Sequence, residues 1–451
     1  MSDNLGLHNQ YSKKYNSSPT LAQKDLYAGD GGLLTDDAAN RFDQGEGYFA
    51  GGEIDGRRAT RRGSRLRVLN TRRNLRPAYE LRQEAERRLV EALTEVGPRS
   101  LADVSKLAGL DYTTTVRTYH RMHNQLGLRC IAAANFEALN LAMAYFSLSI
   151  APKFKGAGLE SMSRLKTLSR IALDSSDPSN AFGLIYVPSD YRGHEYLKLF
   201  QSLKENGIIE DYSYRIYSKR LRYGVIPSCI NWVKGTYVFD WQNLKPRPSE
   251  ETVYEPQESS MDAIDLYLIK ELELDAGVSF SDMSRSLRSQ RGVELSERLL
   301  LYHFREHVIK RKMLSRYKVF LTGSENLRVY VEAEPLTDKV NEYLNLVRSN
   351  PLLTVEFLDH MNSSVLSVFD VPGEHYAGLM RNFLPKALRL TLKTSVRVAI
   401  PGLRLGYTIP YELFDSKLRR WEFNWEADSV AVTNAAHELV DKEAPKNSSS
   451  Q

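Results

Sequence analysis

The hydrophobic pattern of the chain is most regular between residues 100 and 127, SLADVSKLAGLDYTTTVRTYHRMHNQLG. Apolar residues follow the N-cap candidate Ser100 at helical spacing and define one face of a short helix. Gly109 ends this helix, and a second helix begins after Asp111 and ends at Gly127. Two short helices joined by a tight glycine-containing turn predict a helix-turn-helix.

The second helix of this motif carries the side chains expected of a helix that lies in a DNA major groove. Small polar groups occupy its first turn, and cationic groups follow. The alternative is a plain helical hairpin with a solvated polar face. We favour DNA binding because a basic segment precedes the motif. The predicted DNA-contacting residues of this helix are Tyr112, Thr113, Thr114, Thr115, Arg117, His120 and Arg121.

Beyond the motif, apolar runs alternate with helical spacings. Strands separated by helices in this order predict an α+β sandwich with helices on one face of an antiparallel sheet. We expect a short strand or wing at residues 128–134, strands at residues 139–150, 181–187 and 211–218, and helices at residues 159–173 and 196–203.

The same succession of elements begins again after a Pro- and Glu-rich linker. SFSDMS at residues 279–284 matches SLADVS at residues 100–105 at an offset of 179, and Pro188 and Pro372 end equivalent strands at an offset of 184. Several matches at a near-constant offset predict an internal duplication. In the second copy we expect helices at residues 264–272, 296–312, 336–347 and 376–388, and strands at residues 327–333, 352–358, 365–371 and 390–400.

Positive charge is concentrated in one segment. The chain carries a net charge of +5, and residues 57–76 hold nine arginines and no acid, so +5 minus nine leaves −4 elsewhere. A solvated linker is one interpretation. Because the segment precedes the helix-turn-helix, we favour an arm that reaches DNA phosphates or a minor groove. The arm residues predicted to contact DNA are Arg57, Arg58, Arg61, Arg62 and Arg65.

The sequence contains none of the familiar catalytic motifs. A Gly-rich phosphate loop, HExxH, GxSxG and CxxC are all absent, so we predict no enzyme, no catalytic residue and no cofactor. His303 and His307 have the i, i+4 spacing of a metal-binding pair, but no third ligand is recognisable, and no metal site is predicted. Glu332 and Glu334 share one face of a strand, most simply a solvated one.

Composition indicates an intracellular protein. Cys130 and Cys229 are the only cysteines, so no disulfide framework is expected. No apolar run approaches the ~20 residues of a membrane span, and the first residues lack the apolar core of a secretory signal. We therefore predict a cytoplasmic, nucleoid-associated protein without a membrane partner.

A helix-turn-helix followed by strand-helix-strand-strand-helix-strand resembles the Lrp/AsnC transcription regulators. MDAID at residues 261–265 and DAGVSFS at residues 275–281 carry the resemblance best. It implies the α+β class, with two tandem units that each hold a winged helix-turn-helix and a ferredoxin-like βαββαβ sandwich. It also implies double-stranded DNA as partner and homo-oligomers formed through the sandwich domains. The family's Gly-Asp turn is missing, so the resemblance does not extend to an amino-acid effector.

These patterns divide the chain into seven segments. They are a disordered arm at 1–76 that is basic at 57–76, helix-turn-helix 1 at 77–135, sandwich 1 at 136–243, a linker at 244–260, helix-turn-helix 2 at 261–318, sandwich 2 at 319–428 and a disordered tail at 429–451.

The two recognition helices are not equivalent. The second begins ERLLLY at residues 297–302, and its glutamate and leucines suit packing better than contact with a duplex. Arg298 and Arg305 remain able to contact the DNA backbone. We therefore predict a sequence-specific transcription regulator with the first helix-turn-helix as its main reader. The alternative is a chromatin-architecture or protein-interaction protein without sequence preference.

Overall fold

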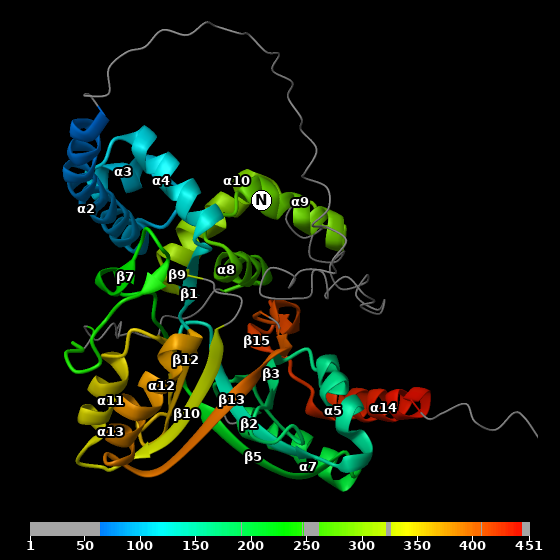
Figure 1. Cartoon of the computed structure of the whole chain (residues 1–451). Helices are drawn as coiled ribbons and strands as arrows, with labels where there is room; N and C mark the ends of the chain where they lie inside the picture. The colour runs from blue at the N-terminus through cyan, green and yellow to red at the C-terminus, as the bar shows by residue number, and fades with distance from the viewer. Residues whose placement is uncertain are drawn as a thin grey trace, which may run out of the picture. The chain divides into compact units, whose positions relative to one another are not determined.

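The computed structural model describes residues 64–190, 192–245, 247, 261–321, 326–406 and 408–443. Helices surround a large antiparallel sheet, so the predicted α+β class is confirmed (Figure 1). None of the described helices combines the length and the apolar character needed to cross a lipid bilayer.

Two groups of helices, each followed by a strand, lie on one side of the sheet. In the first three-helix unit, Ser100 caps α3 by accepting a hydrogen bond from the amide of Asp103 at 3.2 Å. Gly109 then ends α3 with a φ of 62°, which a glycine adopts without strain. The unit comprises α2 (Ser64–Val96), α3 (Leu101–Ala108), α4 (Tyr112–Gln125) and β1 (Leu128–Ala134).

The second three-helix unit has the same order of elements. Asp262 caps its first helix, Ser279 its second and Ser296 its third. The third helix continues as a π-helical turn, a form that is rare in proteins and frequent at functional sites. The unit comprises α8 (Ala263–Leu274), α9 (Phe280–Arg291), α10 (Glu297–Tyr302), the π-helix η6 (His303–Ile309) and β9 (Leu314–Leu321).

The strands of the two units pair with each other. β1 and β9 run antiparallel, with Leu128 opposite Leu321 and Cys130 opposite Val319. α2 packs on β9 and α8 packs on β1, so each unit supports the strand of the other. The amide of Ala276, just after α8, donates to the carbonyl of Cys130 at 2.9 Å.

Four strands form the first half-sheet, in the order β5-β2-β4-β3, with every pair antiparallel. One α-helix lies between β2 and β3 in sequence, and two lie between β4 and β5, the first of them the short α6 (Arg192–Glu195). The elements are β2 (Leu141–Ile150), α5 (Lys155–Ser161), β3 (Leu168–Asp174), β4 (Asn180–Pro188), α7 (Leu197–Glu205) and β5 (Ile209–Tyr217).

The second half-sheet repeats this topology in the order β13-β10-β12-β11. Its strands are β10 (Leu327–Pro335), β11 (Leu353–Leu358), β12 (Val365–Val371) and β13 (Thr391–Gly406), and its helices are α11 (Val340–Arg348), α12 (Gly373–Gly378), the π-helix η7 (Leu379–Phe383) and α13 (Leu384–Leu388).

Each half-sheet sends a strand to the other, which makes one nine-stranded sheet of the described strands. β6 (Lys219–Arg222) continues from β5 after a single residue and pairs with β11. The end of the long strand β13 pairs with β3, with Arg404 opposite Ala172. Since β5 and β6 stand at the two ends of the strand order, the sheet curls back on itself.

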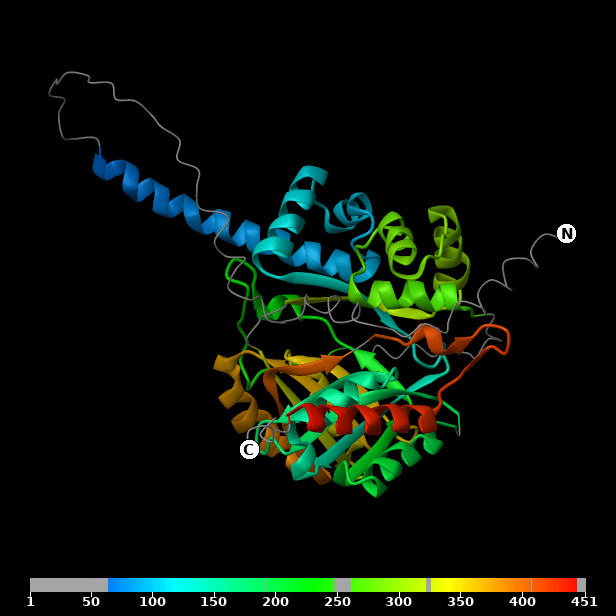
Figure 2. The same ribbon diagram turned by 90° about the vertical axis from the view of Figure 1, so that its right-hand side faces the viewer.

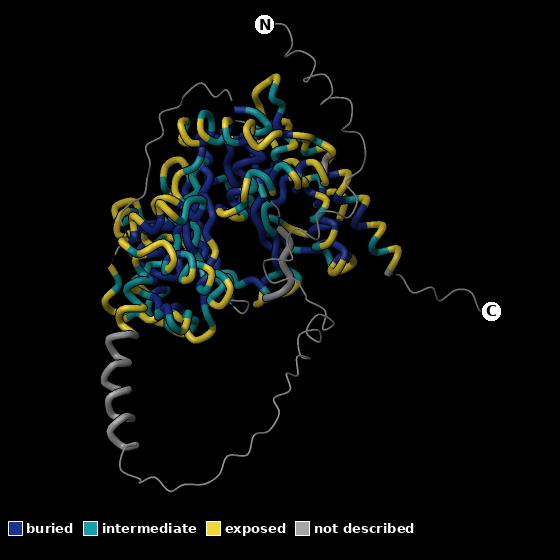
Figure 3. Tube along the Cα trace, turned by 90° about the horizontal axis from the view of Figure 1, so that it is seen from above, coloured by how far each residue is buried: buried dark blue, intermediate teal, exposed yellow. Residues whose placement is uncertain are grey.

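Alternate residues of the strands face different cores, as the period of two requires. The inner faces of both half-sheets share one core, in which the rings of Phe182 and Tyr330 meet edge to face at 5.0 Å. α5, α7 and α14 (Trp425–Glu443) cover the outer face of the first half-sheet (Figure 2). The helices of the second half-sheet cover its own outer face. β2, β4 and β12 are buried along almost their whole length, whereas β5, β6 and β13 are partly exposed, and further exposed residues lie on helices and in loops (Figure 3).

Short elements complete the described chain. They are the 3-10 turns η3 (Pro152–Phe154), η4 (Met162–Arg164), η5 (Pro227–Cys229) and η8 (Tyr411–Leu413), the helix α6 (Arg192–Glu195), and the strands β7 (Ile230–Asn231), β8 (Thr236–Tyr237), β14 (Phe414–Asp415) and β15 (Arg420–Trp421).

Three sequence-based predictions of local structure are wrong. The helix expected at 159–173 is helical only as far as residue 164, in α5 and η4, and residues 168–173 belong to β3, because pairing with β4 and β13 outweighs an apolar spacing that also suits a helix. Residues 64–76 of the expected disordered arm belong to α2, consistent with the helix propensity of Arg and Leu. Most of the expected disordered tail is α14, which buries Val432 and Ala436. Nearly all of the expected linker lies outside the described residues.

Candidate functional site

The third helix of the first unit, α4, presents a polar stripe to solvent. Its N-cap Asp111 accepts a hydrogen bond from the amide of Thr114 at 2.8 Å. Hydrogen bonds from the Thr114 hydroxyl and amide lower the pKa of the Asp111 carboxyl. Along the exposed face, the spacing i, i+4, i+7, i+11 keeps the side chains on one side of the helix. The stripe consists of Thr113, Arg117, His120 and Asn124.

Some of the predicted DNA-contacting residues of α4 do not belong to this stripe. Thr115 is wrongly predicted, because its side chain is fully buried and its hydroxyl donates to the Asp111 carbonyl at 3.0 Å. Thr114 is only half-buried, and Tyr112, 58% exposed, precedes the stripe. Asn124 was missed, although its spacing from Arg117 was visible in the sequence.

Arg121 holds α4 against α2 and does not belong to the stripe. Its guanidinium pairs with the Glu86 carboxylate, which is 1% exposed. Arg82 pairs with the same carboxylate at 2.9 Å. A buried carboxylate requires such a counter-charge. The prediction that Arg121 contacts DNA therefore does not agree with its position.

The second unit presents a corresponding stripe on α10 and η6. Arg298, Tyr302, Arg305 and Ile309 are exposed and lie 185 residues after the members of the α4 stripe. The predicted packing role of the leucines holds for Leu300, which is fully buried. The two arginines predicted to reach the DNA backbone thus share one exposed face with an aromatic and an aliphatic side chain.

The arginine arm falls largely outside the described residues. Arg57, Arg58, Arg61 and Arg62 precede them, and Arg65 lies in the first turn of α2.

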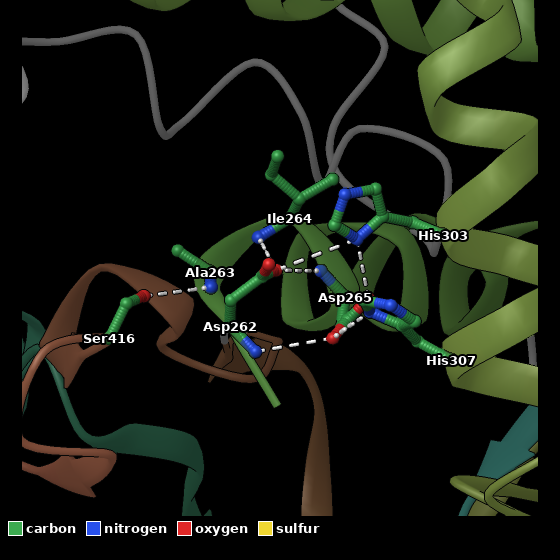
Figure 4. A network of polar contacts seen from close by, with 7 residues as sticks. All are labelled: Asp262, Ala263, Ile264, Asp265, His303, His307 and Ser416. Carbon is green, nitrogen blue, oxygen red and sulfur yellow. Dashed lines mark hydrogen bonds and ion pairs between the residues drawn. The ribbon is translucent and has the colours of Figure 1, made fainter. Parts of the chain in front are cut away.

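Two aspartates and two histidines form a compact cluster in the second unit (Figure 4). Asp262 and Asp265 belong to the N-terminal end of α8, whereas His303 and His307 project from η6. One ligand-type atom of each residue lies within 4.8 Å of those of the others. We name these residues the His-Asp cluster.

The cluster is tightly connected. The Nδ1 atom of His303 lies 2.8 Å from Oδ1 of Asp265 and 3.7 Å from Oδ1 of Asp262. The Nδ1 atom of His307 lies 3.1 Å from Oδ1 of Asp265. Asp265 is fully buried and His303 is 8% exposed at its side chain. Two nitrogen and two oxygen ligands of this kind can hold a divalent transition metal ion.

Burial and charge shift the pKa values in the cluster. Burial and the neighbouring Asp265 carboxylate raise the pKa of Asp262. Burial lowers the pKa of His303, but its hydrogen bond to Asp265 and the charge of Asp262 outweigh this effect and raise it overall. The sequence revealed the histidine pair and missed the aspartates, which lie about forty residues earlier and meet the pair only in the folded chain.

Comparisons with known proteins identify no family. No family model matches the chain, and no curated protein matches it. Parts of the chain are similar to two transcriptional regulators of known structure, one of which belongs to the AsnC family.

Three solved structures illustrate the similarity. The siroheme decarboxylase NirDL matches 79% of this chain and 99% of its own, at 11% identity and a TM-score of 0.45. The regulator NMB0573 of Neisseria meningitidis, solved with L-Met, matches 29% of this chain and 86% of its own, at 16% identity and a TM-score of 0.25. An AsnC family regulator of Agrobacterium tumefaciens matches 31% and 92%, at 17% identity and a TM-score of 0.25. Similarity at this level assigns neither a ligand nor an activity to this chain.

The prediction that the chain is not an enzyme is wrong as an exclusion, because an enzyme matches most of its length. Missing sequence motifs do not exclude catalysis in a chain of this arrangement.

Proposed function

We propose that the chain is a tandem of two Lrp/AsnC-like units, each a winged helix-turn-helix followed by a ferredoxin-like sandwich. The matching orders of helices and strands in the two halves support this interpretation. So does the mutual pairing of β1 with β9, of β6 with β11 and of β13 with β3. One polypeptide would then provide the arrangement that two subunits provide in the resembled family.

We propose that this tandem binds double-stranded DNA and regulates transcription. The observation that carries the proposal is the pair of exposed stripes at equivalent positions of the two third helices. A helix with polar side chains at this spacing suits the major groove. The pairing of β1 with β9 fixes the two helices with respect to each other, so the spacing of two DNA half-sites would be fixed as well.

The chemistry of the stripes favours the first unit as the sequence reader. Thr113, Arg117, His120 and Asn124 offer donors and acceptors to base edges. On the second stripe, Arg298 and Arg305 suit phosphates, which carry no sequence information. The second candidate function, architectural binding without sequence preference, is favoured by these two arginines together with the arginine arm.

Selection from a random duplex pool, followed by affinity measurement at fixed salt, tests the proposal. We expect R117A to weaken binding to the selected site by about tenfold or more, consistent with ~1–3 kcal/mol for a base contact. K386A changes an exposed cation on α13, outside both stripes, and should leave affinity unchanged. Equal affinity for selected and scrambled duplexes would favour the architectural function, and no binding to either would reject both.

A further inference from the structure

We propose that the His-Asp cluster binds one divalent transition metal ion of the Zn²⁺ type. Asp262, Asp265, His303 and His307 would be its ligands. The inference concerns the second three-helix unit alone and does not depend on DNA binding.

The spacing of the ligand atoms fits such an ion. Zn²⁺ lies about 2.0–2.2 Å from imidazole nitrogen and carboxylate oxygen, so neighbouring ligands of a tetrahedral site are roughly 3.3–3.5 Å apart. The cluster distances of 2.8, 3.1 and 3.7 Å bracket this value. All pairs of ligand atoms lie within 4.8 Å of one another, so side-chain rotations that bring the wider pairs closer would admit the ion.

The backbone around the cluster holds the carboxylates in place. Oδ1 of Asp262 accepts hydrogen bonds from the amides of Ile264 at 2.8 Å and Asp265 at 3.0 Å. Oδ2 of Asp265 accepts one from the amide of Asp262 at 3.2 Å. This capping box of α8 gives both carboxylates the supporting hydrogen bonds that orient metal ligands. The amide of Ala263 donates a further hydrogen bond to the hydroxyl of Ser416 at 3.1 Å.

The π-helical turn places the histidines. His303 and His307 lie in η6, with ring centroids 4.6 Å apart, and both Nδ1 atoms point at the carboxylate of Asp265 (Figure 4). A π-helical turn costs stability relative to an α-helix, and such turns are frequent at functional sites. Here the turn sets two imidazoles on the side of the helix that faces α8.

In the first unit, the buried carboxylate at the equivalent position has different partners. Glu86 lies 179 residues before Asp265 and is likewise buried, and two arginines provide its positive charge. At Asp265 the partners are two imidazoles, which carry no permanent charge. A metal cation held by Asp265, Asp262 and the histidines would add a fixed positive charge beside the two carboxylates, in addition to the Arg311 charge that acts on His303.

Metal uptake by the full chain tests the proposal. After treatment with a chelator, the protein should bind one equivalent of Zn²⁺ in calorimetric titration, and Zn²⁺ should raise its thermal midpoint. Co²⁺ should give the strong visible absorption of a tetrahedral site. We expect H307Q and D262N each to weaken Zn²⁺ binding by about tenfold or more.

Two controls make the result decisive. H123Q removes a half-buried histidine of α4 outside the cluster and should leave Zn²⁺ affinity unchanged. His307 is partly exposed, so H307Q is expected to fold, and circular dichroism verifies this. The proposal is overturned if the wild-type chain takes up no Zn²⁺, if H307Q binds as tightly as wild type, or if H123Q weakens binding equally. DNA affinity measured without metal is a separate observation and decides only the regulatory function.

Discussion

Arg220 of β6 and Glu273 of α8 form an ion pair that is almost completely buried, with side chains 4% and 2% exposed. The Arg220 guanidinium also lies 3.8 Å from the ring centroid of Phe136, and Glu273 accepts a hydrogen bond from the amide of Ala134 at 3.2 Å. The pair thus joins the sheet to the second three-helix unit and to the strand of the first.

Loss of one partner of this pair should strongly destabilise the chain. E273Q leaves the Arg220 charge buried without its counter-ion, and we expect the free energy of unfolding to fall by about 3–5 kcal/mol in urea denaturation. D282N, which breaks the exposed pair of Asp282 with Arg285, should cost less than about 1 kcal/mol. An E273Q chain as stable as D282N would show that the pair contributes little.

The same pair should make stability depend on pH. Burial raises the pKa of Glu273, but the charges of Arg220 and Arg222 outweigh it and lower it below 4.5. The stabilisation is therefore complete above pH 4.5 and is lost as the pH falls through the folded-state pKa. Urea denaturation between pH 5 and pH 3 should show the difference between wild type and E273Q shrinking. A constant difference would contradict this assignment.

Asp428 should show the opposite dependence. Burial raises its pKa more than the hydrogen bond from the Tyr196 hydroxyl lowers it. A raised folded-state pKa gives a stabilisation that is present below pH 3.8 and is lost as the pH rises through that pKa. Each tenfold difference in proton affinity corresponds to about 1.4 kcal/mol. D428N, which stays neutral, should become more stable relative to wild type between pH 4 and pH 7, and thermal unfolding at both values checks this.

Arg117 and Arg121 lie one turn apart on α4 and should respond differently to substitution. R121M removes a partner of buried Glu86 and should lower the free energy of unfolding by about 1–3 kcal/mol. R117A removes an exposed side chain and should leave stability within about 0.5 kcal/mol while weakening DNA binding. Measurements of the free energy of unfolding and of duplex affinity on both variants test this difference. Equal losses of stability would contradict the assignment of Arg117 to the exposed stripe.

The pairing of the half-sheets within one chain predicts unfolding that does not depend on protein concentration. β3 pairs with β13 and β11 pairs with β6, so these edges are occupied by the same molecule. Subunits held by mass action gain stability as concentration rises, whereas tethered halves do not. Thermal midpoints over a hundredfold range of concentration should coincide. A rising midpoint would indicate association between copies, as the resemblance to dimeric regulators implies.

The sequence predicted the features that depend only on residues close together in the chain. Caps at Ser100 and Asp111, the glycine at Gly109 and the strand β1 follow from hydrogen bonds and spacings within a few residues. The same reasoning failed at β3, where the partner strands come from distant parts of the sequence and decide the conformation.

Predicting the sites required contacts over long separations. Arg121 and Arg117 look alike in sequence, and only the buried Glu86, thirty-five residues earlier, separates their roles. Likewise His303 and His307 show no third ligand in the sequence, because Asp262 and Asp265 lie about forty residues earlier, on another helix. The roles of such residues depend on how far their side chains are buried, and this burial depends on the whole fold.

The pairing of strands across the two half-sheets also decides when each strand can complete its folding during synthesis. The last residues of β13 must leave the ribosome before β3 obtains its second neighbour, and β1 and β6 likewise wait for β9 and β11. Until then, the nascent first half exposes strand edges that are prone to wrong pairing. A chain truncated after residue 245 would keep those edges permanently, so we expect the two halves to be inseparable by proteolysis or by gene dissection.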